Sequence, residues 1–231
     1  MFLGTVVAAY LPAPRKQEEN GQYWSNLSKV LTDRRWLSFF FSVSLFGMSL
    51  SILTNYFVLF FDSLGGEESL YGLSASVASL SELPVFAVSA IILRKRSAHF
   101  LITIGFLALV IKGFSFALIQ TPEWAIPAQM LHGPTYAAML VGGVNYVKKL
   151  SPPGMGASMQ ALLGAAMFGV SGSMGALIGS HLYDTVGPIT LFRIAGMISL
   201  FGLLVFTISE SILEKSSRES DKVLKQSALQ G

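Results

Sequence analysis

The segment WLSFFFSVSLFGMSLSILTNYFVLFF, residues 36–61, decides the fold, because it is mostly apolar and contains no charged residue. A helix of about 20 mostly apolar residues crosses the roughly 30 Å hydrocarbon core of a bilayer. A strand of a membrane barrel would instead show a short run in which apolar and polar residues alternate. The segment therefore predicts a membrane-spanning helix.

Five further apolar runs follow along the chain, separated by short connections. Hydrophobic residues make up 52% of the chain and charged residues 13%, which is typical of a protein whose solvent is lipid. We predict an all-α integral membrane protein with six transmembrane helices. Their expected bounds are Trp36–Phe61, Leu70–Leu93, Phe100–Ile119, Ala125–Val147, Ala157–Tyr183 and Pro188–Ser209.

Lysine and arginine residues gather in alternate connections. The second connection contains RKR at residues 94–96 and the fourth contains KK at residues 148–149, whereas the connections at residues 62–69, 120–124 and 184–187 contain neither lysine nor arginine. The positive-inside rule assigns the cation-rich side to the cytoplasm. We therefore expect a multi-pass protein of the cell membrane with both termini in the cytoplasm.

The segments outside the six runs complete the predicted organisation. Residues 1–14 are apolar but too short to span, and they lack the positive start of a signal peptide, so we expect the stub of a preceding apolar helix. Residues 15–35 read as a cytoplasmic linker with a short interfacial helix. Residues 36–209 form the six-span membrane domain, and residues 210–231 a cytoplasmic tail.

Ionisable residues inside the spans are candidates for function, because each costs at least about 2.5–3.5 kcal/mol to insert unless it is paired or hydrated. They are Glu82, Lys112, His132 and Arg193. Glu82 lies near the middle of its span beside Pro84, which frees a backbone carbonyl. Its carboxyl group could carry a proton; alternatively it is a structural partner of Lys112. Arg193 lies close to the outer end of its span, where we expect it to snorkel.

The helical rise gives the depths of Glu82, Lys112 and His132 in the membrane. With a rise of about 1.5 Å per residue, Lys112 and His132 are both roughly 10 Å below the outer surface and Glu82 about 8 Å deeper. A flexible lysine side chain can cover much of that distance. We predict a cluster in which Glu82 and His132 couple protons and Lys112 faces the substrate cavity. For His132 alone, an interhelical hydrogen bond is the alternative.

The fourth span combines a polar face with an interruption. Gln129, His132 and Tyr136 share one helix face, and Gly133 with Pro134 is expected to interrupt the helix beside His132. A broken helix near the bilayer middle is typical of a transporter site. The cavity residues predicted in addition to Lys112 are Gln129, Tyr136, Ser79, Asn55 and Gln160.

Three stretches resemble the lactose-permease-like branch of the major facilitator superfamily, which includes nucleoside and phenylpropionate proton symporters. They are SELPVF at 81–86, QMLHGPTYAAM at 129–139 and MQALLGAAMFGVSGSMGALIGSHLYDTVG at 159–187. Their order fits the carboxy-terminal half of that fold. The resemblance implies one half built as a 3+3 helix repeat and secondary active, proton-coupled transport of a small organic solute. It also implies a second six-helix half, either from a homodimer or separately encoded.

Two alternatives stay open. The chain could be an inactive or partner-dependent product of a split gene, because one half supplies only one wall of a pathway. It could also be a rhomboid-like intramembrane serine protease, since GVSG occurs at 169–172, although His181 lies about 15 Å along the same helix from Ser171. We expect no enzyme activity, no cofactor, no metal site and no nucleic-acid partner; the expected partners are solute, protons and lipid.

Overall fold

The computed structural model describes residues 25, 28, 30 and 32–230. The predictions for residues 1–14 and most of those for residues 15–35 lie outside this part of the chain. Every element of the described part is a helix, which confirms the predicted all-helical class. The elements are α3 (Arg34–Asn55), α4 (Phe57–Ser63), α5 (Glu68–Lys95), α6 (Ala98–Phe116), the 3₁₀ helix η1 (Pro122–Trp124), α7 (Ala125–Gln129), α8 (His132–Leu150), α9 (Gly156–Gly164), the π-helix η2 (Ala165–Gly169) and α10 (Val170–Gln230).

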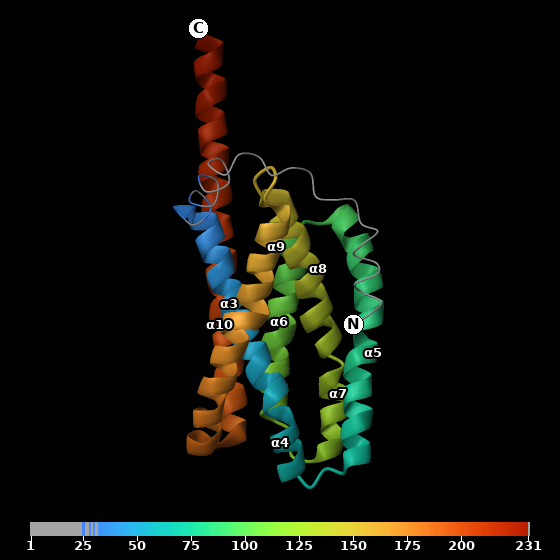
Figure 1. Ribbon diagram of the computed structural model, residues 1–231. Coiled ribbons are helices and arrows are strands. Elements are labelled where there is room, and N and C mark those ends of the chain that lie inside the picture. The colour runs from blue at the N-terminus through green and yellow to red at the C-terminus, as the bar shows by residue number, and fades with distance from the viewer. Residues whose placement is uncertain (1–24, 26–27, 29, 31, 231) are drawn as a thin grey trace, which may run out of the picture.

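Four helical stretches in the described chain are long and apolar enough to cross a membrane. They are Arg34–Ser63, Glu68–Lys95, Ala98–Phe116 and Gly156–Leu213. The last contains a reversal at Gly187, whose φ of 78° and ψ of 167° interrupt the helical backbone of α10 just before Pro188. Figure 1 shows α10 turning back at its lower end and rising to the C-terminus, so it has a descending arm, residues 170–186, and an ascending arm, residues 188–230.

The predicted fourth span is divided between α7 and α8. The interruption lies at Met130 and Leu131, three residues before the predicted Gly133 and Pro134, and His132 is the first residue of α8. Proline explains the shift, because its ring clashes with the carbonyl group four residues earlier, and that residue is Met130 for Pro134. Pro84, by contrast, lies inside α5, which continues through it.

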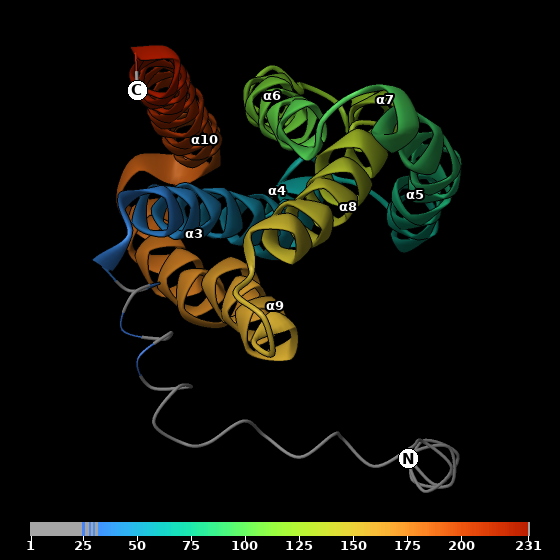
Figure 2. The ribbon, with the colours of Figure 1, turned by 90° about the horizontal axis from the view of Figure 1, so that it is seen from above.

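Helix α3 is central to the packing. Figure 2 shows it between the ascending arm of α10 on one side and the descending arm with α9 on the other. Gly175 and Gly179 permit the close approach of the descending arm: a Cβ atom at Gly175 would lie 2.6 Å from the carbonyl oxygen of Met48, and one at Gly179 would overlap the Tyr56 ring. The small residues of this span thus pack against α3.

The connections alternate between the two ends of the bundle. The α5–α6 and α8–α9 connections lie at the same end as the start of α3 and the C-terminus, while the α4–α5 connection, η1 and the turn inside α10 lie at the opposite end (Figure 1). The first end carries Arg94, Lys95, Arg96, Lys148 and Lys149, and we call it the cationic end.

Candidate functional site

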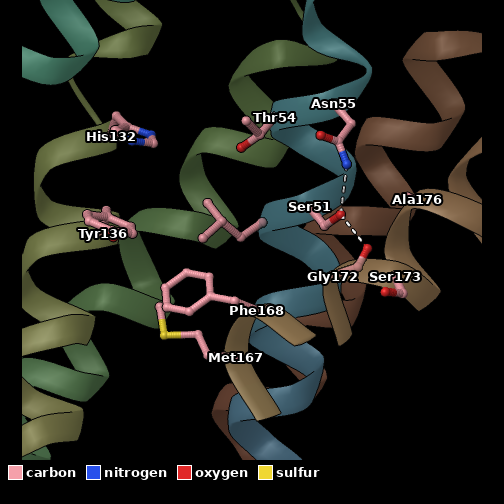
Figure 3. Close-up of a pocket in the computed structure, with 12 residues that line it drawn as sticks. Ser51, Thr54, Asn55, His132, Tyr136, Met167, Phe168, Gly172, Ser173 and Ala176 are labelled. Carbon is pink, nitrogen blue, oxygen red and sulfur yellow. Dashed lines mark hydrogen bonds between the residues drawn. The ribbon is translucent and has the colours of Figure 1, made fainter. Parts of the chain in front are cut away.

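A cavity of about 570 Å³ lies between α3, α8, η2 and the descending arm of α10. Figure 3 shows His132 and Tyr136 on the α8 side of this space and Ser51 and Asn55 on the α3 side. One wall is therefore aromatic and the other hydroxyl- and amide-bearing. Such a mixture of apolar surface with a few polar groups is typical of a small-molecule site.

The aromatic wall is a row of three rings. The rings of His132 and Tyr136, one helical turn apart on α8, are nearly parallel at 5°, with centroids 5.8 Å apart. The Phe168 ring from η2 follows at 6.1 Å from Tyr136. Phe168 faces the cavity from within the π-helix, and such single-turn π segments are common at functional sites.

Hydrogen bonds hold the polar wall in place. The Ser51 hydroxyl donates to the carbonyl oxygen of Gly172 at 2.8 Å and accepts from the Asn55 amide nitrogen at 3.0 Å. The first bond joins α3 to α10 across the cavity edge. The acceptor oxygen of Asn55 lies on a side chain that lines the space, where it can receive a donor from a solute.

Behind the aromatic wall, the structure brings Glu82, Lys112 and His132 into one chain of contacts. Nδ1 of His132 is 3.0 Å from Nζ of Lys112, and Nε2 of His132 is 3.3 Å from Oε1 of Glu82. Lys112 is only 3% exposed and lies over the Phe116 ring at 5.3 Å. His132 thus connects a buried cation to a carboxylate, and it also lines the cavity.

The chemistry of Lys112, His132 and Glu82 decides which atom donates each hydrogen bond in this cluster. A charged ammonium group can only donate, so with Lys112 protonated the Nδ1 atom of His132 accepts. The ring proton of a neutral imidazole then resides on Nε2, from which it points to the Glu82 carboxylate. This arrangement can hold one proton between His132 and Glu82.

Two adjacent residues on each helix meet where α5 contacts the start of α8. Next to the Glu82–His132 contact, the backbone N–H of Gly133 donates to the Ser81 hydroxyl oxygen at 2.8 Å. This satisfies one of the unpaired N–H groups at the start of α8. A Cβ atom at Gly133 would overlap the Ser81 backbone, so glycine is what lets the two helices come this close.

The other predicted site residues are divided between the cavity and other contacts. Asn55 and Tyr136 line the cavity with His132. Lys112, which was also predicted to face it, is not among the lining residues, and neither are Gln129, Ser79 and Gln160. Gln129 is buried, and its Oε1 has no hydrogen-bond partner in the described chain. The Ser79 hydroxyl donates to the Ala75 carbonyl, and the Gln160 amide donates to the Val144 carbonyl, which joins α9 to α8.

Several lining residues were not predicted. Ser51 and Thr54 belong to the same helix face as Asn55, and that i, i+3, i+4 pattern was a usable signal. Phe168 gave no signal, because a π-turn changes the helical register. Ser171 of the GVSG string is buried, and its hydroxyl donates to the Ala166 carbonyl. The described residues contain no group of three or more His, Cys, Asp and Glu side chains able to hold a metal ion.

Comparison with known proteins identifies the family. Residues 5–194 match the MFS_1 like family. The mouse "Major facilitator superfamily domain-containing protein 6-like" is 22% identical over 94% of this chain and 37% of its own length. The Xenopus laevis "Major facilitator superfamily domain-containing protein 6-like protein B" is 21% identical over 90% of this chain and 33% of its own. The chain thus spans about a third of the length of these relatives. Since the family match covers most of the chain, this protein is a membrane protein of the major facilitator superfamily and belongs to its MFS_1 like family.

Proposed function

We propose that the chain is one six-helix half, the carboxy-terminal one, of a transporter that moves a small organic solute together with protons. The observation that carries this proposal is the position of His132. It lines the cavity at the start of the broken α7–α8 helix and, on its other side, contacts Glu82 and Lys112. Solute and proton would therefore act on the same imidazole.

Competition for His132 would provide the coupling. While Glu82 is ionised, it attracts the Nε2–H group of His132 at 3.3 Å. A proton that arrives on Glu82 removes this attraction, so the Nε2–H group can donate to a solute in the cavity. A solute that binds His132 in turn favours the protonated form of Glu82, because coupling between two binding sites is reciprocal.

The proposal includes six membrane crossings. The crossings are α3 with α4, α5, α6, α7 with α8, α9 to the end of the descending arm, and the ascending arm. The alternation of connections between the two ends supports this count (Figure 1). By the positive-inside rule the cationic end faces the cytoplasm, in the cell membrane. A second six-helix half, from a homodimer or a separate chain, would close the open cavity.

Transport by the reconstituted full chain tests the proposal. Proteoliposomes would be assayed with a panel of radiolabelled solutes under an imposed inward proton gradient. Glu82→Gln keeps the shape and hydrogen bonding of the side chain but removes the titratable charge, so proton-driven accumulation should be lost while exchange of solute persists. Glu123→Gln is the matched control, because Glu123 is an exposed carboxylate in η1 and should leave uptake unchanged.

Protein yield separates coupling from a structural ion pair. If Glu82 only neutralises Lys112, Glu82→Gln leaves an uncompensated buried charge, which costs about 3–5 kcal/mol and lowers the yield. The double variant with Lys112→Gln would then restore it. Normal yield with undiminished proton-driven uptake in Glu82→Gln would contradict the proposed role.

A further inference from the structure

A second hollow lies on the outside of the bundle, away from the cavity. It is an apolar groove of about 270 Å³ between α5 and α6, with α8 as its floor. Val85, Val88 and Ile92 of α5 form one side, Leu101 and Ile104 of α6 form the other, and Ala138 lies in the floor. None of these residues lines the solute cavity. Val88 is 50% exposed, so the groove is open toward the surrounding lipid.

One polar atom lies in this apolar groove. Ser89 is completely buried, and its hydroxyl oxygen has no hydrogen-bond partner within the described chain. The other serines of α5 all have acceptors: those at positions 74, 76, 79 and 81 donate to a backbone carbonyl of their own helix, and Ser69 donates to the Glu67 carboxylate. Ser89 therefore has a hydroxyl donor left for a ligand in the groove.

Three exposed cations follow the groove at the end of α5. Arg94 and Lys95 end α5, and Arg96 follows in the connection to α6 at the cationic end. None of the three forms an ion pair with a described residue; Arg96 lies over the Phe100 ring at 5.6 Å. By the helical period, Lys95 and Arg96 continue the face of α5 that carries Val88 and Ile92, whereas Arg94 lies on the opposite face.

The dimensions match one membrane leaflet. From Pro84 at the lower end of the groove to Arg94 the helix rises about 15 Å, which is half of a hydrocarbon core of roughly 30 Å. Ser89 lies about 7.5 Å below Arg94 along the helix. A ligand that fills this site needs an anionic head group, a hydrogen-bond acceptor about 7.5 Å below that group, and an apolar tail.

We propose that the groove binds an anionic phospholipid from the leaflet at the cationic end. The phosphate group contacts Lys95 and Arg96, an ester carbonyl accepts the hydrogen bond of Ser89, and one acyl chain lies between α5 and α6. This lipid site is separate from the proposed transport function and does not depend on it.

Native mass spectrometry of the full chain in mild detergent tests the site, with phosphatidylglycerol and phosphatidylcholine of the same acyl chains as probes. We expect one tightly bound phosphatidylglycerol and weaker binding of phosphatidylcholine. The double variant K95Q/R96Q should weaken phosphatidylglycerol binding about 25-fold, since each cation near a membrane surface contributes roughly a factor of five. Val88→Trp should block the groove and remove the bound lipid while the three cations remain.

Two matched controls distinguish a built site from general surface charge. K148Q/K149Q removes exposed cations at the same end, and Leu83→Trp adds the same ring to an exposed α5 position outside the groove; both should retain the lipid. Equal binding of the two lipids, or equal loss in K148Q/K149Q and K95Q/R96Q, would overturn the proposal. So would retention of the lipid in Val88→Trp.

Discussion

Arg35 of α3 pairs with Glu210 of α10 at the cationic end. Its Nε and one terminal nitrogen lie 3.0 and 2.8 Å from the two carboxylate oxygens, and the Tyr146 hydroxyl of α8 donates to the same carboxylate. The Glu210 side chain is 5% exposed and that of Arg35 36%. The predicted tail boundary at residue 210 thus falls inside a continuous helix, at a buried residue that joins three helices.

The difference in exposure predicts unequal effects of the two single substitutions. Arg35→Ala leaves a buried carboxylate with Tyr146 as its main partner, so we expect a loss of about 3–5 kcal/mol in the free energy of unfolding. Glu210→Gln leaves a partly hydrated guanidinium and keeps an acceptor, so a loss of about 1–2 kcal/mol is expected. Unfolding in mixed detergent micelles measures both. Arg34→Ala, at an exposed neighbour, is the control; equal losses for Arg35→Ala and Arg34→Ala would contradict the assignment.

The turn inside α10 depends on the residue Gly187. Gly187 has a φ of 78° and a ψ of 167°, and it is followed by Pro188. Only glycine adopts this backbone region without strain. The reversal between the two arms of α10 therefore rests on the missing Cβ atom and on the proline that begins the ascending arm.

Substitution of Gly187 should show a purely conformational cost, because a Cβ atom there would meet nothing within 4 Å. Gly187→Ala should destabilise the protein by about 1–3 kcal/mol in the same micelle assay. Gly187→Asn should give no relief, since asparagine tolerates the left-handed helical region but not this extended one. Gly72→Ala, at an exposed and uncrowded helical position, should instead gain about 0.5–1 kcal/mol. An unchanged free energy of unfolding in Gly187→Ala would show that the turn does not require glycine.

At the scale of the whole molecule, the alternation of the connections predicts labelling from opposite sides. The chain has no cysteine, so single cysteines report their own positions. Cysteines at the exposed positions Glu67, Thr121 and Thr185 should react with an impermeant thiol reagent in intact cells, while one at Ser97 should react only after the membrane is opened. Labelling of Ser97→Cys in intact cells would reverse the proposed orientation.

The sequence by itself determined the all-helical membrane class and the general course of the chain. Lipid offers backbone groups no hydrogen-bond partner, so a long apolar run must form a helix, and local composition is sufficient to recognise it. The cost of charge in hydrocarbon likewise marked Glu82, Lys112 and His132 as residues in need of partners.

Only the tertiary structure decided which side chains meet. Arg35 and Glu210 are 175 positions apart, and Ser51 meets Gly172 across 121 positions; no local pattern encodes such pairs. The same holds for Phe168, which reaches the cavity through a π-turn, and for Gln129 and Gln160, which belong to other contacts. Apolar periodicity indicates which residues avoid water, but it does not separate those that face lipid from those that face another helix. The orientation of each helix about its axis is set by close packing at sites such as Gly133 and Gly175.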